Sequence, residues 1–280
     1  MNEATGIYKA RGAKLFFRVV MARAYPRIVG TFRERSWLIF ETVLPLLGTS
    51  AYVFVYRAIE APPEYTGFVV VGGAMIAFWL NILWSMAAQL YWDKDLGNLE
   101  LYIVSPGQMM AILLGMSFGG LVMSGTRAII VLTIASLMFG VTYDTGNIFM
   151  FILIFFLTMS ALYGMGMMLA SVYLVGGRDA WHILELLQEP IYLVTGFYFP
   201  IKSMSLWIAA AASIIPLTLG LDAMRQLLFA GGKALAFLSV NIEALILAVL
   251  VFSYLAAAKY ALAKMETVGR REGRLVERRR

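Results

Sequence analysis

The chain has 280 residues, of which 61% are hydrophobic and only 14% are charged. Soluble domains carry about 25% charged residues, and several windows here exceed the ~18 apolar residues that mark a membrane-spanning helix, so the sequence predicts an all-α polytopic membrane protein. The absence of cysteine and the single His182 exclude a disulfide framework and thiolate or histidine-cluster metal sites. The net charge of +6 gathers at the chain ends, where membrane topology explains it better than nucleic-acid binding.

The two ends of the chain are its most basic parts. Residues 1–36 carry eight Lys or Arg against two acids, and residues 261–280 carry seven against three. Because Lys and Arg gather in cytoplasmic segments, we expect both termini inside and an even number of crossings. We interpret residues 1–36 as a cytoplasmic leader and an interfacial amphipathic helix, broken at Pro26, with a plain leader as the alternative. Residues 261–280 are expected to be a basic cytoplasmic tail.

Residues 37–260 form the predicted membrane domain. About 20 helical residues cross the ~30 Å hydrocarbon core of a bilayer. Six apolar runs meet this requirement, of which the fifth is the shortest: 37–56, 66–90, one within 108–140, 148–174, 182–199 and 241–260. Within the third run, Gly115-x-x-x-Gly119 predicts close packing against another helix. This layout is typical of a multi-pass protein of the cell (inner or plasma) membrane.

A polar island separates the second and third spans at residues 91–106. Its spacing predicts a short amphipathic helix, at about 93–106, that begins near Asp95 or Asn98 and ends at Ser105-Pro106. The apolar surface of this helix is supplied by Leu96, Leu99, Leu101, Ile103 and Val104. A helix of this kind at a membrane surface can dock into another protein.

Five ionisable residues lie inside the predicted spans, where the cost of burying a charge points to a function. They are Glu41, Arg127, Glu185, Glu189 and Glu243. Because Glu185 and Glu189 lie one turn apart on one helix face, we expect Arg127 to pair with one of them. The alternative is that Glu41, Glu185 and Glu189 lie at the cytoplasmic boundary and reach water.

One apolar region, at about 200–232, is left over before the last span. Its core is too short to cross the membrane and is bracketed by Pro200 and Pro216. A single crossing here would place the basic tail outside. We therefore predict a re-entrant helical hairpin whose non-helical backbone is buried by protein.

Three motifs, each weak alone, occur in an order and spacing that one family shares. The polar island supplies Asp93, Lys94, Gly97, Leu99, Glu100, Leu101, Ser105 and Pro106. Gly196-Phe-Tyr-Phe-Pro200 ends the fifth span, and Ile215-Pro-Leu-Thr218 precedes Asp222-Ala-Met-Arg225. Over about residues 10–265, the chain resembles the permeases of ABC-2 type transporters. The island resembles their coupling segment, with Asn98 in place of the usual Thr.

The resemblance implies the transmembrane permease subunit of a half-size ABC exporter. A second permease copy, expected to form a homodimer, and two copies of a separate ABC ATPase would complete it. ATP and Mg would bind to the ATPase, since this chain has no P-loop motif and is expected to bind no cofactor and to be no enzyme. The substrate would be a lipophilic drug, a lipid or a lipid-linked glycan, moved out of the cytoplasm or the inner leaflet.

The resemblance also assigns residues to two sites. The expected contacts of the coupling helix with the ATPase are Asp93, Asp95, Leu96, Gly97, Leu99, Glu100, Leu101, Ser105 and Pro106. The expected residues of the re-entrant region, on the extracellular side of the path, are Gly196, Phe199, Pro200, Pro216 and Arg225. Membrane lipids would surround the chain, and no nucleic-acid partner is expected.

Two other classes of function stay open. A proton-coupled carrier or channel would use Arg127, Glu185, Glu189 and Glu243 and would need no ATPase. A membrane enzyme acting on lipid-linked substrates would need paired polar catalytic residues at the end of a span, and the sequence has none that stand out. Whether the second permease copy is the same chain is open as well.

Overall fold

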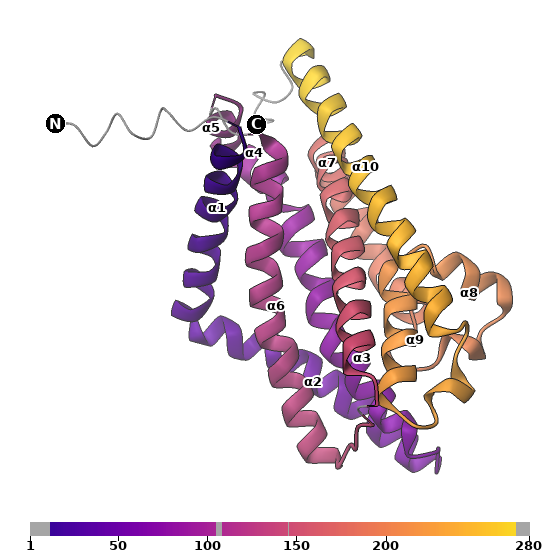
Figure 1. Ribbon diagram of the computed structural model, residues 1–280. Coiled ribbons are helices and arrows are strands. Elements are labelled where there is room, and N and C mark those ends of the chain that lie inside the picture. The colour runs from indigo at the N-terminus through magenta and orange to yellow at the C-terminus, as the bar shows by residue number, and fades with distance from the viewer. Residues whose placement is uncertain (1–11, 105–107, 145, 273–280) are drawn as a thin grey trace.

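The computed structural model describes residues 12–104, 108–144 and 146–272, and within these ranges it contains helices and no strand. Figure 1 shows their arrangement as one elongated bundle. In chain order the elements are α1 (Ala13–Arg33), α2 (Arg35–Ala58), α3 (Glu64–Leu80), the π-helix η2 (Asn81–Ala87), α4 (Gln89–Asp95), α5 (Asn98–Val104), α6 (Met109–Phe139), α7 (Ile148–Val194), the 3₁₀-helix η3 (Ile201–Ser203), α8 (Leu206–Ala212), α9 (Pro216–Leu228), the 3₁₀-helix η4 (Gly232–Leu235) and α10 (Val240–Glu272).

Five helical stretches in the described residues are long and apolar enough to cross a membrane, so the chain is an all-α polytopic membrane protein. They are Leu38–Ala58, Glu64–Asp95, Met109–Phe139, Ile148–Leu174 and Val240–Lys264. These stretches coincide with the first, second, third, fourth and sixth predicted spans. A sixth candidate arises only if α8 and α9 count together as one bent span. The predicted fifth span falls on the later part of α7, so the count of six stays a prediction.

The second span is the central helix of the bundle. Between Gly67 and Trp79 every residue is buried. Its most apolar stretch is 89% buried inside the protein, compared with 17% for the last span. Two glycines allow this close packing, because a side chain at Gly72 would collide with the carbonyl oxygen of Phe197 and one at Gly73 with Thr49. The other spans surround this helix and present their outer faces to lipid.

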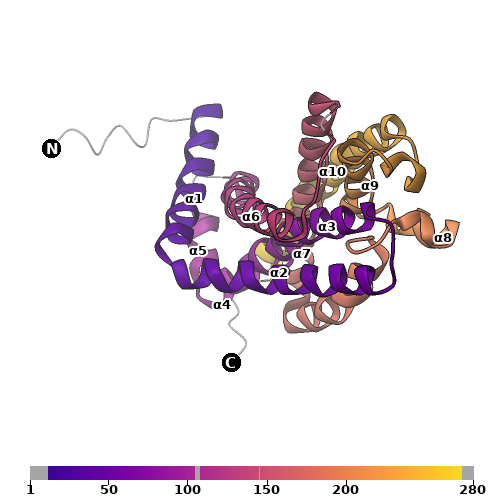
Figure 2. The ribbon, with the colours of Figure 1, turned by 90° about the horizontal axis from the view of Figure 1, so that it is seen from below.

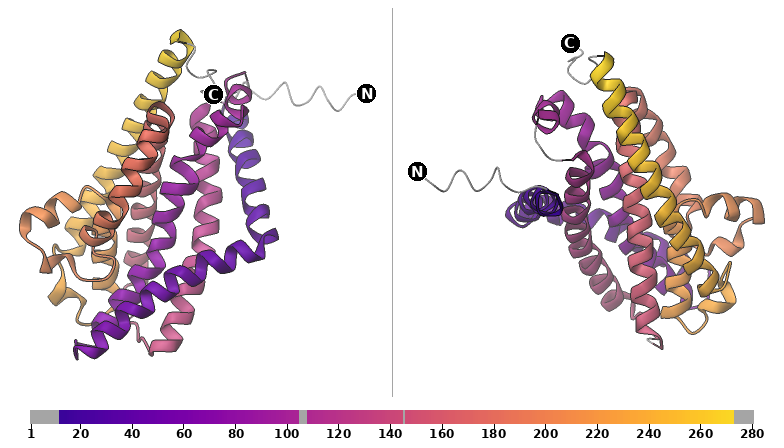
Figure 3. Two further views of the ribbon diagram at one scale, coloured as in Figure 1. Left: turned by 180° about the vertical axis from the view of Figure 1, so that it is seen from behind. Right: turned by 45° about the horizontal axis from the view of Figure 1, so that its top comes forward.

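The N-terminal helix α1 packs against the side of the bundle and crosses α6 at an angle (Figures 1 and 2). A Cβ at Gly115 would meet the Val20 carbonyl, and one at Gly119 would meet Arg27, so the predicted Gly-x-x-x-Gly surface packs against α1. The predicted break at Pro26 is wrong. The helix continues through this exposed proline and ends at Glu34, where α2 begins at an angle (Figure 3).

The helix α7 folds back on itself. A Cβ at Gly166 would meet Ile82, while Gln188 accepts a hydrogen bond at 2.9 Å from Trp84, only two residues further along the central span. A straight helix would separate Gly166 from Gln188 by about 33 Å. The earlier arm of α7 is therefore the fourth span, and the later arm returns beside the central helix toward Val194.

The region between α7 and α10 enters and leaves at the same level of the bundle. Its helices α8 and α9 are bent by 107° relative to each other. Lys202, at the start of the region, donates to the carbonyl oxygen of Ala234 at its end, at 2.8 Å. This is the geometry that a re-entrant hairpin requires. Almost the whole of α9 is buried, whereas Trp207 of α8 is 83% exposed, so α9 packs inside the bundle and α8 projects from it (Figure 1).

The two ends of the bundle carry different elements. The start of α1, α4, α5 and the last turns of α10 gather at one end, which we call the α5 end (Figure 1). At the opposite end, the α2–α3 turn, the α6–α7 turn and the end of α9 enclose a cavity of about 550 Å³. Its lining combines Arg57, Glu64 and Asp144 with the aromatic rings of Tyr143 and Phe229.

Candidate functional site: a polar clamp beneath the coupling segment

The polar island folds as two short helices instead of one. α4 continues the central span to Asp95, and α5 begins at Asn98, one of the two predicted starts. Gly97 joins them with a φ of 79°, a left-handed conformation that only glycine adopts without strain. The chain therefore turns sharply after the span and directs α5 away from it. The seven-residue π-helix η2 lies just before α4, and such segments are often found at functional sites.

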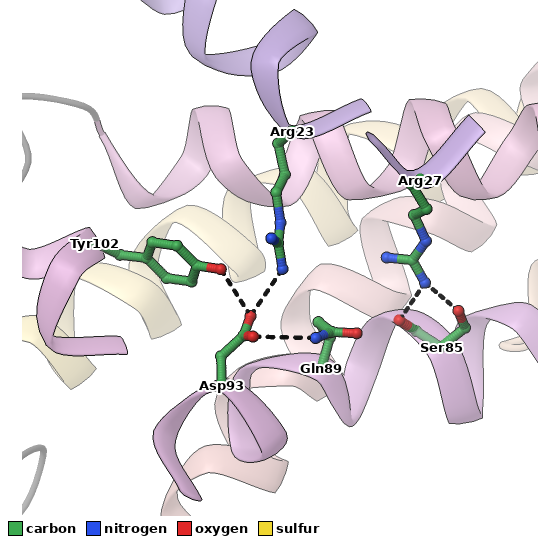
Figure 4. A network of polar contacts seen from close by, with 6 residues as sticks. All are labelled: Arg23, Arg27, Ser85, Gln89, Asp93 and Tyr102. Carbon is green, nitrogen blue, oxygen red and sulfur yellow. Dashed lines mark hydrogen bonds and ion pairs between the residues drawn. The ribbon is translucent and has the colours of Figure 1, made fainter. Parts of the chain in front are cut away.

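Asp93 is the centre of a buried polar cluster that joins three helices (Figure 4). Its carboxylate accepts hydrogen bonds from Arg23 of α1 at 2.9 Å, from Tyr102 of α5 at 3.1 Å and from Gln89 of α4 at 3.1 Å. Asp93 is only 3% exposed, so these three donors replace the water that a buried carboxylate needs. We call these four residues the Asp93 clamp. It fixes α5 relative to α1 and to the central span.

Tyr102 stays protonated across the physiological pH range. Burial raises the pKa of its hydroxyl to about 12, the Arg23 guanidinium opposes this shift, and the Asp93 carboxylate adds to it. The Arg23 guanidinium also lies 5.3 Å from the centre of the Tyr102 ring. The hydroxyl therefore remains a donor to Asp93, and the clamp is intact at neutral pH.

A second arginine of α1 binds the π-helix directly. Arg27 donates from Nη2 to both the carbonyl oxygen and the hydroxyl of Ser85 (Figure 4). Burial, followed by the nearby Arg23 charge, lowers the pKa of Arg27 to about 10, so the side chain is still a cation at neutral pH. Arg23 and Arg27 lie one turn apart and both point into the bundle.

The leucines of the polar island divide into two groups. Leu96 and Leu101 are each 68% exposed at the α5 end. Leu99, which we expected on the docking face, is fully buried in the core of this chain. The correction has a simple cause: α5 is anchored through Tyr102, and Leu99 lies one turn earlier on the same inward side. Asp95 is exposed. Ser105, Pro106 and the side chain of Glu100 lie outside the described residues.

Arg127 pairs with a different carboxylate from the one predicted. Its guanidinium forms an ion pair with Glu41 of α2, and Arg127 is 4% exposed. Glu185 lies instead 4.0 Å from His182 on an exposed part of α7, and Glu189 is exposed. Within one chain, the predicted pair with Glu185 or Glu189 is therefore wrong, because Glu41 takes this place and both glutamates of α7 are exposed.

Glu243 lies in a closed site between α9 and α10. It is fully buried and accepts a hydrogen bond from Gln226 at 2.9 Å. The same Gln226 amide contacts Asp222 at 3.3 Å. The four residues assigned to a proton pathway thus lie in three separate places: Arg127 with Glu41, Glu243 with Gln226, and the two glutamates of α7 at the surface.

Arg225 ties the re-entrant region to the central helix. Its guanidinium donates to the carbonyl oxygens of Phe68 at 2.8 Å, Gly196 at 2.6 Å and Phe197 at 2.7 Å. Gly196 has a φ of 73°, which turns the chain sharply after α7. Of the other predicted residues, Phe199 is partly buried, Pro200 is buried before η3, and Pro216 opens α9 at a position where its missing N–H costs nothing.

Sequence reasoning missed the partners of the clamp. We expected Arg23 and Arg27 to extend toward the lipid headgroups and did not expect a protein partner for either, whereas in the structure Arg23 bonds to Asp93 and Arg27 to Ser85. The spacing of the apolar residues of α1 could have shown which face of this helix turns outward. Phe17, Met21 and Tyr25 recur every four residues and are exposed at 53–69%. Large apolar side chains therefore lie on the outward face of α1.

Comparison with protein families matches residues 16–229 to the ABC-2 type transporter family. The chain belongs to this family. The match covers the clamp, the central span and α9, so the protein is a multi-pass permease subunit of an ABC transporter. Comparison with curated proteins found no match.

Proposed function

We propose that this permease is the membrane half of an ABC exporter and that α5 is the helix through which a separate ATPase drives it. The Asp93 clamp is the observation that carries this proposal. A surface loop has no need of a buried carboxylate with three donors from three helices. A segment that receives force from a partner must be fixed to what it moves.

The exposed leucines support α5 as the docking element. Leu96 directly precedes the Gly97 turn and Leu101 lies on α5, and both are exposed. Recognition of a short helix in a groove draws its energy from a few apolar anchors of this kind. The proposed anchors are therefore Leu96 and Leu101, with Asp95 beside them, and Leu99 holds α5 to the bundle from within.

The clamp supplies a path for the movement. A displacement of α5 passes through Tyr102 and Asp93 to Arg23, and hence to α1 and α2. It passes through α4 to the central span as well, because the two form one continuous stretch from Glu64 to Asp95. In the proposed cycle, ATP and Mg on two ATPase copies close the ATPase pair. The spans of two identical permease copies then tilt to open the path between them.

The α5 end faces the cytoplasm in this proposal, with both termini on that side, as the basic residues at the chain ends favour. The family resemblance supports outward transport of a lipophilic or lipid-linked substrate. The re-entrant region then lies at the outlet.

Substitution of the exposed leucines tests the proposal. In purified permease mixed with its ATPase, Leu101→Asp should abolish complex formation or the ATPase response, while the permease folds and inserts normally. A lost apolar anchor costs about 2 kcal/mol of binding. Asn98→Asp is the matched control, because it adds the same charge to the same helix at its first residue, where an acid is favourable. Normal assembly of both Leu96→Asp and Leu101→Asp would refute α5 as the docking helix.

A further inference from the structure

Arg23 and Arg27 place two like charges one turn apart on the inner face of α1. Such a pair is unfavourable by itself. Asp93 neutralises Arg23 through the 2.9 Å ion pair. Arg27 has only the neutral oxygens of Ser85, and Arg127, a third arginine, lies near enough to lower its pKa further. Arg23, Arg27 and Asp93 together therefore carry a net charge of about +1.

The Arg27 side chain has N–H donors that its bonds to Ser85 do not use. It uses Nη2 for both of its hydrogen bonds, and among the described residues its Nε and Nη1 bond to no protein atom. Neither atom belongs to the fully enclosed polar atoms without partners. Arg23 donates from Nη2 to Asp93, lies against Tyr102 and is 31% exposed. The partly exposed Arg23 guanidinium and the unused donors of Arg27 thus lie on the same side of α1, one turn apart (Figure 4).

The depth of this pair matches the headgroup layer of a membrane. The span from Glu64 to Asp95 has 32 residues, about 48 Å, whereas the hydrocarbon core is ~30 Å thick. The clamp at Asp93 lies in the last turn of this span, so Arg23 lies in the headgroup layer and Arg27 just below it. The outer face of α1, with Phe17, Met21 and Tyr25 exposed, is suited to acyl chains at the same level.

We propose that Arg23 and Arg27 together bind the phosphate group of an anionic membrane lipid in the leaflet at the α5 end. Guanidinium groups bind phosphate oxygens through paired N–H donors. The Asp93 carboxylate is occupied by three donors and does not compete for them. A bound phosphate balances the excess charge and holds α1 against η2. A soluble phosphate would meet the same donors, and the experiment separates these two sources.

Lipid titration of the purified full-length permease, without ATPase, tests the proposal. Short-chain phosphatidylglycerol should bind and raise the melting temperature more than phosphatidylcholine of the same chain length. Arg27→Gln should weaken that binding about tenfold. Arg18→Gln, at an exposed arginine of the same helix, should leave it unchanged. Arg27→Lys keeps the charge and should retain more binding than Arg27→Gln.

Four outcomes would overturn the proposal. Arg27→Gln could bind phosphatidylglycerol like the parent protein, which would exclude the site. Arg18→Gln could lose as much binding as Arg27→Gln, which would mean that the lipid is held by general charge attraction. Arg27→Lys could also lose as much, which would mean that the substitution acts through helix packing. Inorganic phosphate at equal concentration could displace the lipid, which would assign the site to a soluble anion. Because no ATPase is present, these results are independent of the role proposed for α5.

Discussion

Arg225 of α9 donates from Nη2 to the carbonyl oxygen of Phe197 at 2.7 Å, although 28 residues separate them. The same guanidinium reaches the carbonyl oxygens of Gly196 and Phe68. One side chain thus satisfies backbone groups of the chain after α7 and of the central span, in a place that water does not reach. Non-helical backbone inside a membrane protein requires such partners.

Removal of this side chain should destabilise the protein strongly. Arg225→Ala removes the hydrogen bonds that this guanidinium makes to three buried carbonyl groups, and we expect a loss of about 3 kcal/mol or more in the free energy of unfolding. Thermal unfolding in detergent measures it. Arg57→Ala is the matched control, because exposed Arg57 donates to only one carbonyl oxygen, that of Phe139. If both substitutions lower the free energy of unfolding equally, the several hydrogen bonds of Arg225 stabilise the protein no more than the one bond of Arg57.

The close approach of α1 to α6 can be tested with two glycines of one helix. A methyl group at Gly115 would meet the Val20 carbonyl oxygen and the Arg23 side chain, whereas one at Gly125 meets nothing within 4 Å. Gly115→Ala should therefore lower the melting temperature. Gly125→Ala should raise stability by about 0.5–1 kcal/mol, since alanine favours the helix. If both variants change the melting temperature in the same direction, the packing of α1 on α6 is contradicted.

The ion pair of Arg127 and Glu41 should behave as a coupled unit. Arg127→Gln removes the partner of Glu41, and we expect a cost of about 1–2 kcal/mol, because the Glu41 side chain is 30% exposed. The double variant Arg127→Gln with Glu41→Gln should recover part of this loss in a double-mutant cycle. Glu189→Gln, at an exposed residue of α7, is the control and should be neutral. Full additivity of the two single losses would mean that the pair does not form.

Glu243 should tolerate replacement by its amide better than loss of its side chain. It shares the amide of Gln226 with Asp222, so two carboxyl groups meet at one donor. Glu243→Gln keeps the shape of the side chain. Glu243→Ala leaves a cavity and should cost about 2 kcal/mol or more of stability. Melting temperatures compare the two, and a proton-coupled carrier would be indicated instead if Glu243→Gln folded normally and abolished transport.

The Asp93 clamp predicts a link between stability and coupling. Asp93→Asn keeps the size of the side chain but removes the ion pair with Arg23, and we expect a loss of about 1–2 kcal/mol, because Arg23 is partly exposed. With the ATPase present, transport should fall more than ATP hydrolysis, since α5 would still dock but pass less of its movement to α1. An unchanged ratio of transport to hydrolysis would argue against a force-bearing clamp.

Most of the membrane architecture follows from the sequence. Long apolar runs have only one stable form in a bilayer, so five of the six predicted spans recur as candidate spans in the structure. Asn98, one of the two predicted starts of the short helix after the second span, likewise begins α5 in the structure, because helix capping is a local property. The family resemblance rested on these same local signals, and the family match agrees with it.

Only the tertiary structure decided which side chains meet. Several carboxylates could pair with Arg127, and the sequence does not show that Glu41 lies closer to it in space than Glu185. In a chain that is apolar on every face, hydrophobic periodicity does not show which face turns inward, so the burial of Leu99 and the inward direction of Arg23 and Arg27 could not be read from it. These contacts depend on how helices distant in the sequence pack together, and glycines such as Gly115 set how closely they approach.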